Sequence, residues 1–248
     1  MKKTIQYRKI NTENVFAKER QSIDLKEFSN NIFWEMFIKQ RAEGSEEMKI
    51  ILMRHGKSEH ADRFPISCTD FAKWVDDYDK AGIIQETAVP ESTKLQAQEA
   101  NLIVTSTLCR SIQSAKRLEG KAPILSDMLF REAEMPVTSF SFFDIKLPPS
   151  FWAICHRCGW LAGYKGKRES IQEARERAAQ ASNRLIQLAA EHERVLLAGH
   201  GVFNQFIARE LLRAGWRGER KTGRHHWSCT SYTYKEPENR QGRLSRLS

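Results

Sequence analysis

Three short apolar runs stand out along the chain, at 49–53, 101–105 and 195–198. Each run is aliphatic on consecutive positions rather than on alternate ones, as expected of parallel strands that are covered on both faces. Helical patterns follow two of these runs directly, at 107–118 and 202–213. Strands that alternate with helices predict an α/β fold, here a three-layer α/β/α sandwich with a mostly parallel central sheet.

Two further helices are predicted from capping signals and periodicity. The longer one covers 170–192, where Ser170 and Glu173 have the spacing of a capping box. Small and apolar residues then recur every three or four positions along one face of this helix. The shorter one covers 70–82 and ends at a glycine that can cap it.

The stretch 140–164 is rich in aromatic residues and has two interpretations. It is either a wall over a pocket that selects an apolar substrate or a helix that packs on the sheet, and we favour the helix. The core residues of that helix would be Phe151, Trp152 and Trp160. Cys155 and Cys158 have the spacing of metal ligands, but a structural zinc site needs a second ligand pair. The distant candidates are His225, His226 and Cys229, and because nothing else indicates a zinc site, we expect no metal.

The two ends of the chain differ from its middle. Residues 1–47 are polar apart from one amphipathic pattern at 24–41, so we interpret them as an N-terminal helical extension. The alternative is a helix that packs on the outside of the main domain. Met48 opens the first apolar run, and we place the main domain at 48–234. The polar residues 235–248 are interpreted as a C-terminal tail.

The composition says more about the binding partner of the protein than about its fold. The formal net charge of +9 predicts an anionic partner, such as a phosphate, a nucleic acid or an acidic surface. Basic residues are spread along the chain, with only loose clusters at 217–224 and 240–246, so nucleic acid binding is not favoured. The five cysteines have irregular spacings, which favours a reducing cytoplasm over a disulfide framework. No apolar run approaches the roughly 18 residues that a membrane span needs, and no signal peptide is recognised.

Candidate chemistry gathers at the carboxyl ends of the predicted strands, where ligands bind in open parallel sheets. Arg54 and His55 follow the first strand, Arg110 lies in the first turn after the second, and His200 follows the third. Arginine forks bind phosphoryl oxygens, and a neutral imidazole can attack phosphorus. A second histidine can donate to the oxygens on which charge develops. These groups suit a phosphoryl group without a metal, and the glycine that follows each histidine lets the backbone approach the ligand.

These residues lie in three motifs, 54-RHG-56, 105-TSTLCRSIQSA-115 and 196-LLAGHG-201. The first motif alone is weak, but the ordered set of three is specific. Together they resemble the histidine phosphatase superfamily, which has the phosphoglycerate mutase-like fold. The resemblance covers roughly residues 48–234.

The resemblance implies a role for each residue. His55 would be the residue that is phosphorylated during the reaction. Arg54, Arg110 and His200 would form the phosphate pocket. The general acid of the family follows the next apolar region, which transfers that role to Glu132.

Several positions leave alternatives open or depart from the family pattern. Glu134 is a rival for the role of Glu132 because it is only two residues away. Many members have a phosphate-binding asparagine shortly after the first histidine, where this chain has Ala61. Ser58 is a candidate extra donor to the phosphate. The segment after the acid also lacks the arginine-tyrosine-glycine run of the mutases, and both departures favour a phosphatase.

The sequence therefore predicts a metal-independent phosphatase that needs no cofactor and hydrolyses a small phosphomonoester through a phosphohistidine on His55. Two alternatives remain: a phosphohistidine-protein phosphatase with the same pocket, and a non-catalytic module that binds phosphate or phosphoproteins. The long segment 133–169 disfavours the first, because compact members of that type have little lid. The presence of both histidines and a candidate acid disfavours the second, since binding alone needs no nucleophile.

Overall fold

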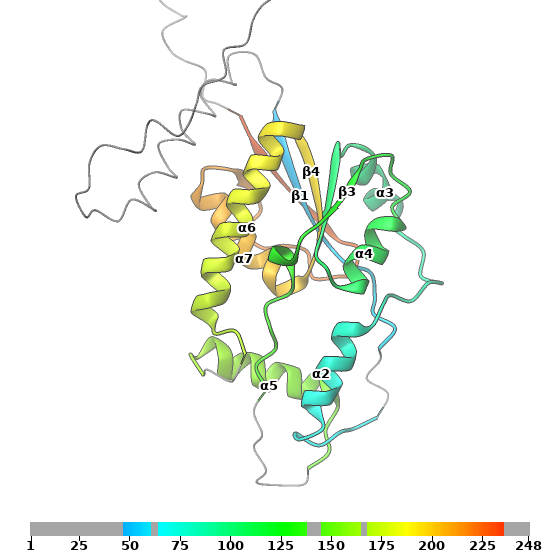
Figure 1. Cartoon of the computed structure of the whole chain (residues 1–248), viewed down its shortest axis with the longest axis vertical. Helices are drawn as coiled ribbons and strands as arrows, with labels where there is room; N and C mark the ends of the chain where they lie inside the picture. Colours follow the sequence, from blue (N-terminus) through cyan, green and yellow to red (C-terminus); the bar gives the residue numbers. More distant parts are fainter. Residues whose placement is uncertain (1–46, 61–63, 138–144, 165–167, 236–248) are drawn as a thin grey trace, which may run out of the picture. The chain divides into compact units, whose positions relative to one another are not determined.

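A six-stranded sheet organises the part of the chain that the structure describes. The computed structural model describes residues 47–60, 64–137, 145–164 and 168–235. All of them belong to one of the two compact units of the chain, Glu46–Ser248. The strand order is β3-β2-β4-β1-β6-β5, and helices cover both faces of the sheet (Figure 1). The predicted three-layer α/β/α sandwich is confirmed.

The three predicted strands are present as β1 (Met48–Arg54), β2 (Leu102–Thr105) and β4 (Arg194–Gly199). They pair in parallel, with β4 between β2 and β1. The sequence analysis did not predict the other three strands, which are the parallel β3 (Ile124–Ser126) and the antiparallel β5 (Arg217–Gly218) and β6 (Cys229–Tyr234). β3 and β5 are too short for a periodic signal, and β6 (CTSYTY) has threonine or serine at three of its six positions, so it forms no apolar run.

The helices of the described residues are α2 (Phe71–Lys80), α3 (Glu91–Gln98), α4 (Cys109–Lys116), α5 (Pro149–Leu161), α6 (Ile171–His192) and α7 (Gly201–Arg213), together with the short 3-10 helix η2 (Met128–Phe130). The predicted helices correspond to α2, α4, α6 and α7, whereas α3 was not predicted. The capping box of α6 is present, because Ser170 and Glu173 each accept a hydrogen bond from the other's backbone amide. The predicted glycine cap of α2 is wrong, since the helix ends at an extended Ala81.

Consecutive apolar residues in the central strands follow from burial on both faces. Ile51 and Met53 of β1 belong to one core cluster with Ala97 of α3 and Ala115 of α4. The alternate position Leu52 is equally buried on the opposite face, where α6 and α7 contact β1. A strand enclosed in this way has no position at which a polar side chain would reach water.

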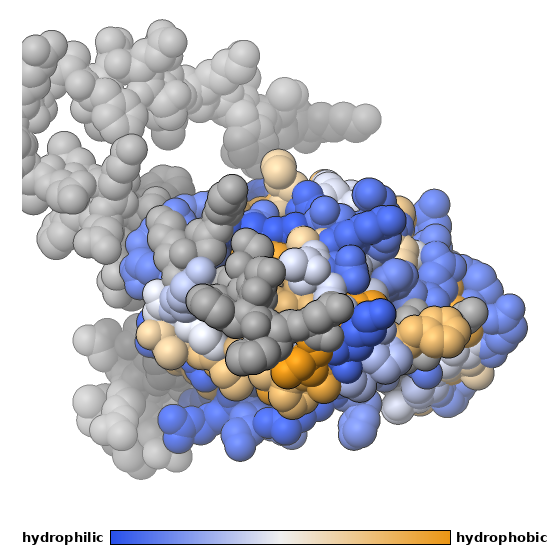
Figure 2. Space-filling model, turned by 90° about the horizontal axis from the view of Figure 1, so that it is seen from below, coloured by the Kyte–Doolittle hydropathy of each residue, from blue (hydrophilic) through white to orange (hydrophobic). Residues whose placement is uncertain are grey.

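The aromatic-rich stretch forms α5, but this helix does not lie where we expected. Figure 1 shows α5 and α2 beyond the ends of the strands rather than on a face of the sheet, and the two helices contact each other. Trp160 is fully buried, but the prediction that Phe151 is a core residue is wrong, because Phe151 is 48% exposed. Helical spacing places it with Ile154 and Leu161, on the side opposite Trp160. Figure 2 views the molecule from below, and apolar residues in orange are visible there among hydrophilic ones.

The division of the chain into extension, domain and tail stays a prediction. The predicted helix at 24–41 and most of the tail at 235–248 lie outside the described residues. β1 begins at Met48, where we placed the start of the domain. Within the described ranges, no helix is long and apolar enough to cross a bilayer.

We expect the substitution Ser170→Ala to lower the free energy of unfolding by about 1 kcal/mol, because the amide of Glu173 loses its capping partner. Urea denaturation followed by circular dichroism measures this change. The matched control is Ser150→Ala in the first turn of α5, where Pro148 is the N-cap and no side chain caps the helix. Its effect should stay within about 0.5 kcal/mol. Equal losses in the two variants would contradict the capping role.

Candidate active site

The parallel register between β1 and β4 brings His55 and His200 together. Arg54 pairs with Gly199 across the two strands, and the amide of His55 donates to the Gly199 carbonyl at 3.0 Å. The next residue on each strand is therefore a histidine, and the two ring centroids lie 5.2 Å apart. Both side chains are buried. Two strand ends that are distant in the sequence thus deliver their imidazoles to one place.

His55 is held as a neutral imidazole with a defined tautomer. Burial lowers its pKa to about 3, and the charge of Arg110 adds to this shift. Its Nδ1 lies 2.7 Å from the carbonyl oxygen of Gly56. A carbonyl can only accept, so Nδ1 carries the proton and the lone pair of the ring is on Nε2. His55 therefore has the electronic form of a nucleophile at neutral pH.

Gly56 accommodates Trp227. A Cβ atom at Gly56 would clash with the ring of Trp227, so no larger residue fits there. The amide of Trp227 donates to the Arg54 carbonyl at 2.9 Å, and the amide of Gly56 donates to Ser114 Oγ at 2.8 Å. The sequence analysis expected this glycine to make room for a ligand. The structure shows that it makes room for a tryptophan that arrives just before β6.

Ser106 forms a hydrogen bond with one ring nitrogen of His200. Its Oγ lies 2.7 Å from His200 Nε2 and accepts a hydrogen bond from the amide of Leu108 at 3.2 Å. The hydroxyl still has its hydrogen and a second lone pair, so it can donate to Nε2 or accept from it. Burial, with the nearby His55 as the next cause, lowers the pKa of His200 well below its usual value. Nδ1 is buried and has no hydrogen-bond partner within the described residues.

Arg54 and Arg110, like His200, each have a buried nitrogen that lacks a hydrogen-bond partner among the described residues. The side chain of Arg110 is 1% exposed, and its terminal nitrogens donate to the Tyr78 carbonyl at 3.0 Å and to Asp79 Oδ1 at 3.1 Å. Arg54 donates through Nη1 to the Arg224 carbonyl. In the part of the chain described here, the Nε of each arginine is buried without a partner. Both charges lower the pKa of His55, so the two guanidinium groups lie near its imidazole.

Glu132, rather than Glu134, binds the first turn of α7, whose N-cap is His200. The carboxylate of Glu132 accepts hydrogen bonds from two amides in the first turn of α7, at 2.8 and 3.2 Å. Glu134 is turned the other way, and its carboxylate accepts from the amide of Glu169 at 3.1 Å. The two candidate acids therefore differ in position. Glu132 binds the helix that begins after His200, whereas Glu134 binds the amide of Glu169.

Comparison with known proteins agrees with this geometry. Residues 50–247 match the family model described as the histidine phosphatase superfamily (branch 1). The chain belongs to this superfamily. A search of curated proteins finds no match.

Solved structures show the same fold at low sequence identity. Mycobacterial hydrolase 1 is 16% identical, with a TM-score of 0.53, and the match covers 77% of this chain and 92% of that chain. Mycobacterial hydrolase 2 is 15% identical, with a TM-score of 0.51 and coverage of 79% and 85%. A mycobacterial glucosyl-3-phosphoglycerate phosphatase is 17% identical, with a TM-score of 0.43 and coverage of 68% and 81%. At such identities the likeness shows the fold alone.

His226 is a third histidine at the site of this superfamily member. From the sequence, His226 was considered only as a distant candidate zinc ligand. Its ring centroid lies 5.5 Å from that of His55, and its Nδ1 lies 3.0 Å from the His55 carbonyl oxygen. Burial, followed by the charge of Arg54, lowers its pKa. No sequence signal indicated this contact, because it depends on the antiparallel pairing of β6 with β1.

The remaining candidates stay predictions. The hydroxyl of Ser58 is buried and accepts from the amide of His60 at 3.2 Å, so it already has one partner. Ala61 lies outside the described residues. Cys155 and Cys158 are both exposed on α5. Among the described side chains, no group of three histidines, cysteines or carboxylates is arranged to hold a metal ion.

The buried neutral histidine makes stability depend on pH. The pKa of His55 is 6.5 in the unfolded chain and about 3 in the folded one, so the unfolded state binds more protons between these values. Stability should therefore fall as the pH drops below 6.5, by about 1.4 kcal/mol per pH unit. In the variant His55→Asn, the loss of unfolding free energy from pH 7 to pH 5 should be smaller by about 2 kcal/mol.

Urea denaturation at the two pH values measures this difference. The control is His225→Asn at an exposed position near the same loop, which should keep the parental pH dependence. Identical pH slopes for the parent and His55→Asn would show that His55 is not held neutral by the fold.

Proposed function

We propose that this superfamily member is a phosphatase that hydrolyses small phosphomonoesters through a phosphohistidine on His55, without a metal ion or cofactor. The observation that carries the proposal is a neutral, buried imidazole with its lone pair on Nε2, next to buried N–H groups that lack acceptors. Those donors are the Nε–H groups of Arg54 and Arg110, and the buried Nδ1 of His200 likewise has no partner among the described residues. Unsatisfied cationic donors call for an anion, and a nucleophile beside them suits an electrophilic centre within that anion. A phosphoryl group meets both requirements.

In the first half of the reaction, Nε2 of His55 attacks the phosphorus and the bond to the ester oxygen breaks. Glu132 in its protonated form gives its proton to the departing oxygen, so the product leaves as a neutral alcohol. The N–H groups of Arg54, Arg110 and His200 bind the non-bridging oxygens, on which charge accumulates in the transition state.

In the second half, a water molecule attacks the phosphorus of the phosphohistidine. The carboxylate of Glu132 now takes the proton of that water, since the group that acted as an acid is left as a base. The N–P bond breaks, its electron pair returns to Nε2, and inorganic phosphate leaves. Both His55 and Glu132 are then in their starting forms.

We also propose a reducing cytoplasm as the compartment of this enzyme. Cys155 and Cys158 are exposed thiols on one helix, as proteins of reducing compartments tolerate. Binding to nucleic acid is not part of the proposal, because the arginines of the site are placed around a single buried centre rather than along an exposed groove.

Brief incubation with radiolabelled 4-nitrophenyl phosphate, followed by denaturation, should leave acid-labile label on His55. The variant His55→Ala should lose this label, and its kcat should fall by about a thousandfold or more, because the nucleophile is gone. His192→Ala, at the end of α6, is the control and should keep both. Turnover by His55→Ala at the parental rate would refute the mechanism. Tight phosphate binding by the parent without turnover of any phosphomonoester would favour a binding module instead.

The variant Glu132→Gln should lower kcat/KM for an alkyl phosphate by about 10²- to 10⁴-fold, and kcat/KM reports only the steps up to loss of the leaving group. Its effect on 4-nitrophenyl phosphate should be much smaller, because nitrophenolate leaves without being protonated. Glu134→Gln is the matched control and should keep the parental ratio of the two rates, since its carboxylate faces Glu169. Steady-state kinetics with both substrates measure this ratio. The reverse result would transfer the acid role to Glu134.

A further inference from the structure

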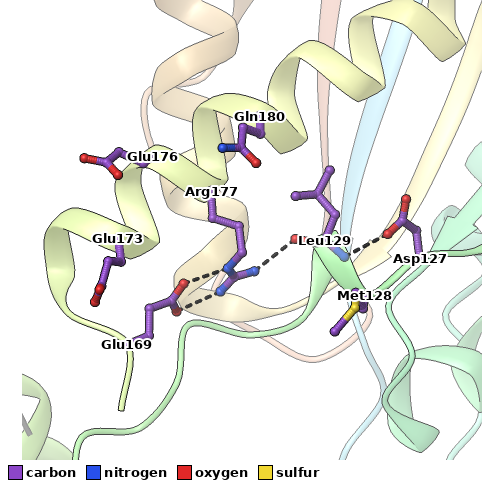
Figure 3. Close-up of a pocket in the computed structure, with 8 residues that line it drawn as sticks. All are labelled: Asp127, Met128, Leu129, Glu169, Glu173, Glu176, Arg177 and Gln180. Atoms are coloured by element: carbon purple, nitrogen blue, oxygen red, sulfur yellow. Dashed lines mark hydrogen bonds and ion pairs between the residues drawn. The ribbon is translucent and has the colours of Figure 1, made fainter. Parts of the chain in front are cut away.

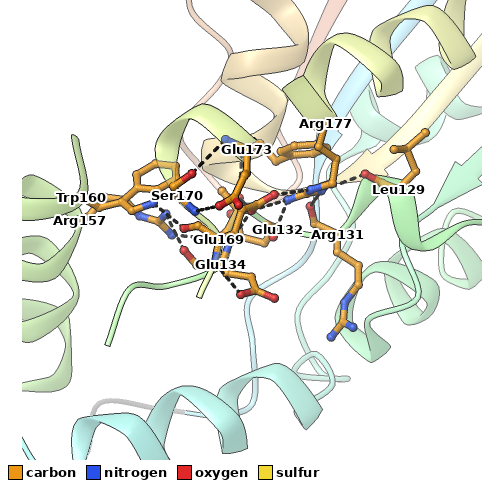
Figure 4. Close-up of polar contacts among 12 residues, drawn as sticks. Leu129, Arg131, Glu132, Glu134, Arg157, Trp160, Glu169, Ser170, Glu173 and Arg177 are labelled. Carbon is orange, nitrogen blue, oxygen red and sulfur yellow. Dashed lines mark hydrogen bonds and ion pairs between the residues drawn. The ribbon is translucent and has the colours of Figure 1, made fainter. Parts of the chain in front are cut away.

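Arg177 of α6 binds the backbone of the segment that carries Glu132. Its guanidinium donates to the carbonyl oxygens of Leu129 at 2.9 Å, Arg131 at 2.8 Å and Glu132 at 3.3 Å. It also forms a two-pronged ion pair with Glu169, at 2.7 and 2.8 Å. Figure 4 shows these contacts converging on one side chain. A single arginine thus binds three backbone carbonyls of another segment.

The segment that Arg177 binds has no regular structure of its own to position it. After η2, residues 131–137 belong to no helix or strand. Backbone carbonyls in such a segment need partners from elsewhere in the molecule. The guanidinium of Arg177 supplies those partners for the residues that lead up to the candidate acid. The position of Glu132 along the chain path is therefore set by a side chain rather than by a sheet ladder.

Arg177 also contacts the group that holds the carboxylate of Glu132. Its Cζ lies 3.9 Å from the ring centroid of Phe203, in a cation–π arrangement. The amide of Phe203 donates to Oε1 of Glu132 at 2.8 Å. Arg177 therefore contacts both groups that fix the position of Glu132. One is the backbone carbonyl of Glu132, and the other is the first turn of α7, which binds the Glu132 carboxylate.

Arg177 is not placed to bind a substrate anion. Glu169 pairs with its charge, and both side chains of this ion pair are largely buried, at 21% and 13% exposure. The cavity that Arg177 borders has a volume of about 460 Å³ (Figure 3). Its lining includes four carboxylates, from Asp127, Glu169, Glu173 and Glu176. Such a cavity repels a phosphate dianion, so Arg177 acts on its neighbours in the fold.

We propose that Arg177 is a positioning residue for Glu132, which sets where the acid meets the leaving-group oxygen. The proposal rests on the function proposed above. A misplaced acid would slow protonation of the leaving group, while attack by His55 and binding of the phosphoryl group would continue. Loss of Arg177 should therefore reproduce the leaving-group signature of the Glu132→Gln variant.

The test compares kcat/KM for glycerol phosphate, which has a poor leaving group, with kcat/KM for 4-nitrophenyl phosphate, because kcat/KM excludes the hydrolysis of the phosphohistidine that both substrates share. In Arg177→Met, the rate with glycerol phosphate should fall by about tenfold to a hundredfold, and the rate with the aryl ester by less than about threefold. The ratio of the two rates does not depend on how much of the variant is folded, because both rates scale with the same number of active sites. The inhibition constant of inorganic phosphate should stay at its parental value.

Arg184→Met is the matched control. Arg184 lies two turns further along α6, and its guanidinium donates to Gln187 of the same helix at 3.3 Å. This variant makes the same substitution at another position of α6, and it should keep the parental ratio of rates. A lowered ratio in Arg184→Met as well as in Arg177→Met would mean that the effect belongs to α6 as a whole, and the proposal would be overturned.

Two further variants separate geometry from charge. The charge of Arg177 also contributes to the lowered pKa of His200, after burial, His55 and Arg110. Arg177→Lys keeps that charge, but one ammonium group cannot reach three carbonyls and a carboxylate, so it should lose the alkyl-phosphate rate as Arg177→Met does. Full activity in Arg177→Lys would overturn the proposal.

The double variant Glu132→Gln/Arg177→Met should hydrolyse glycerol phosphate no more slowly than Glu132→Gln alone, because the residue to be positioned is already lost. Additive losses would overturn the positioning role. So would equal losses of Arg177→Met on the two substrates. If the proposed function itself is wrong, the result is different. His55→Ala then still turns over the substrates, whatever the ratio of the two rates in Arg177→Met.

Discussion

The parallel pairing of β1 with β4 is the constraint on which the candidate site depends. Its register places Arg54 opposite Gly199, so the histidines that follow on each strand meet at 5.2 Å. Because side chains alternate between the faces of a sheet, a shift of one residue would move every buried side chain of the strand to the opposite face. β1 is apolar on both faces, so its hydrophobic pattern does not by itself specify this register, and close packing against the surrounding strands and helices must do so. The register aligns His55 with His200.

The site gathers positive groups in a place where water is scarce. Burial keeps His55 and His200 neutral, which lowers the repulsion between them and the nearby arginines. Tyr78 and Asp79 bind the outer nitrogens of Arg110, while its Nε, the Nε of Arg54 and one nitrogen of His200 remain without acceptors in the described part of the chain. The fold thus tolerates a locally unfavourable arrangement that an anion would relieve, as is common at functional sites.

The candidate acid reaches the site by a different structural route from the histidines. His55 and His200 stand at the ends of strands, where the hydrogen bonds between neighbouring strands set their positions. Glu132 lies in an irregular segment, and its position depends on two arginines from helices: Arg177 binds the carbonyls up to Glu132, and Arg157 binds those of Ala133 and Glu134. The ion pair with Glu169 orients the first of these arginines. Precision in an irregular segment is therefore supplied by side chains packed behind it.

The sequence by itself determined the central strands, the helices that follow two of them, and the place of His55 and His200 at strand ends. Those features follow from the spacing of neighbouring apolar residues, which is a local property. Tertiary structure alone decided that Glu132 faces α7 while Glu134 faces Glu169, and that His226 lies beside His55. Both outcomes depend on the path of segments without periodicity and on pairing between distant strands, and neither leaves a pattern along the chain.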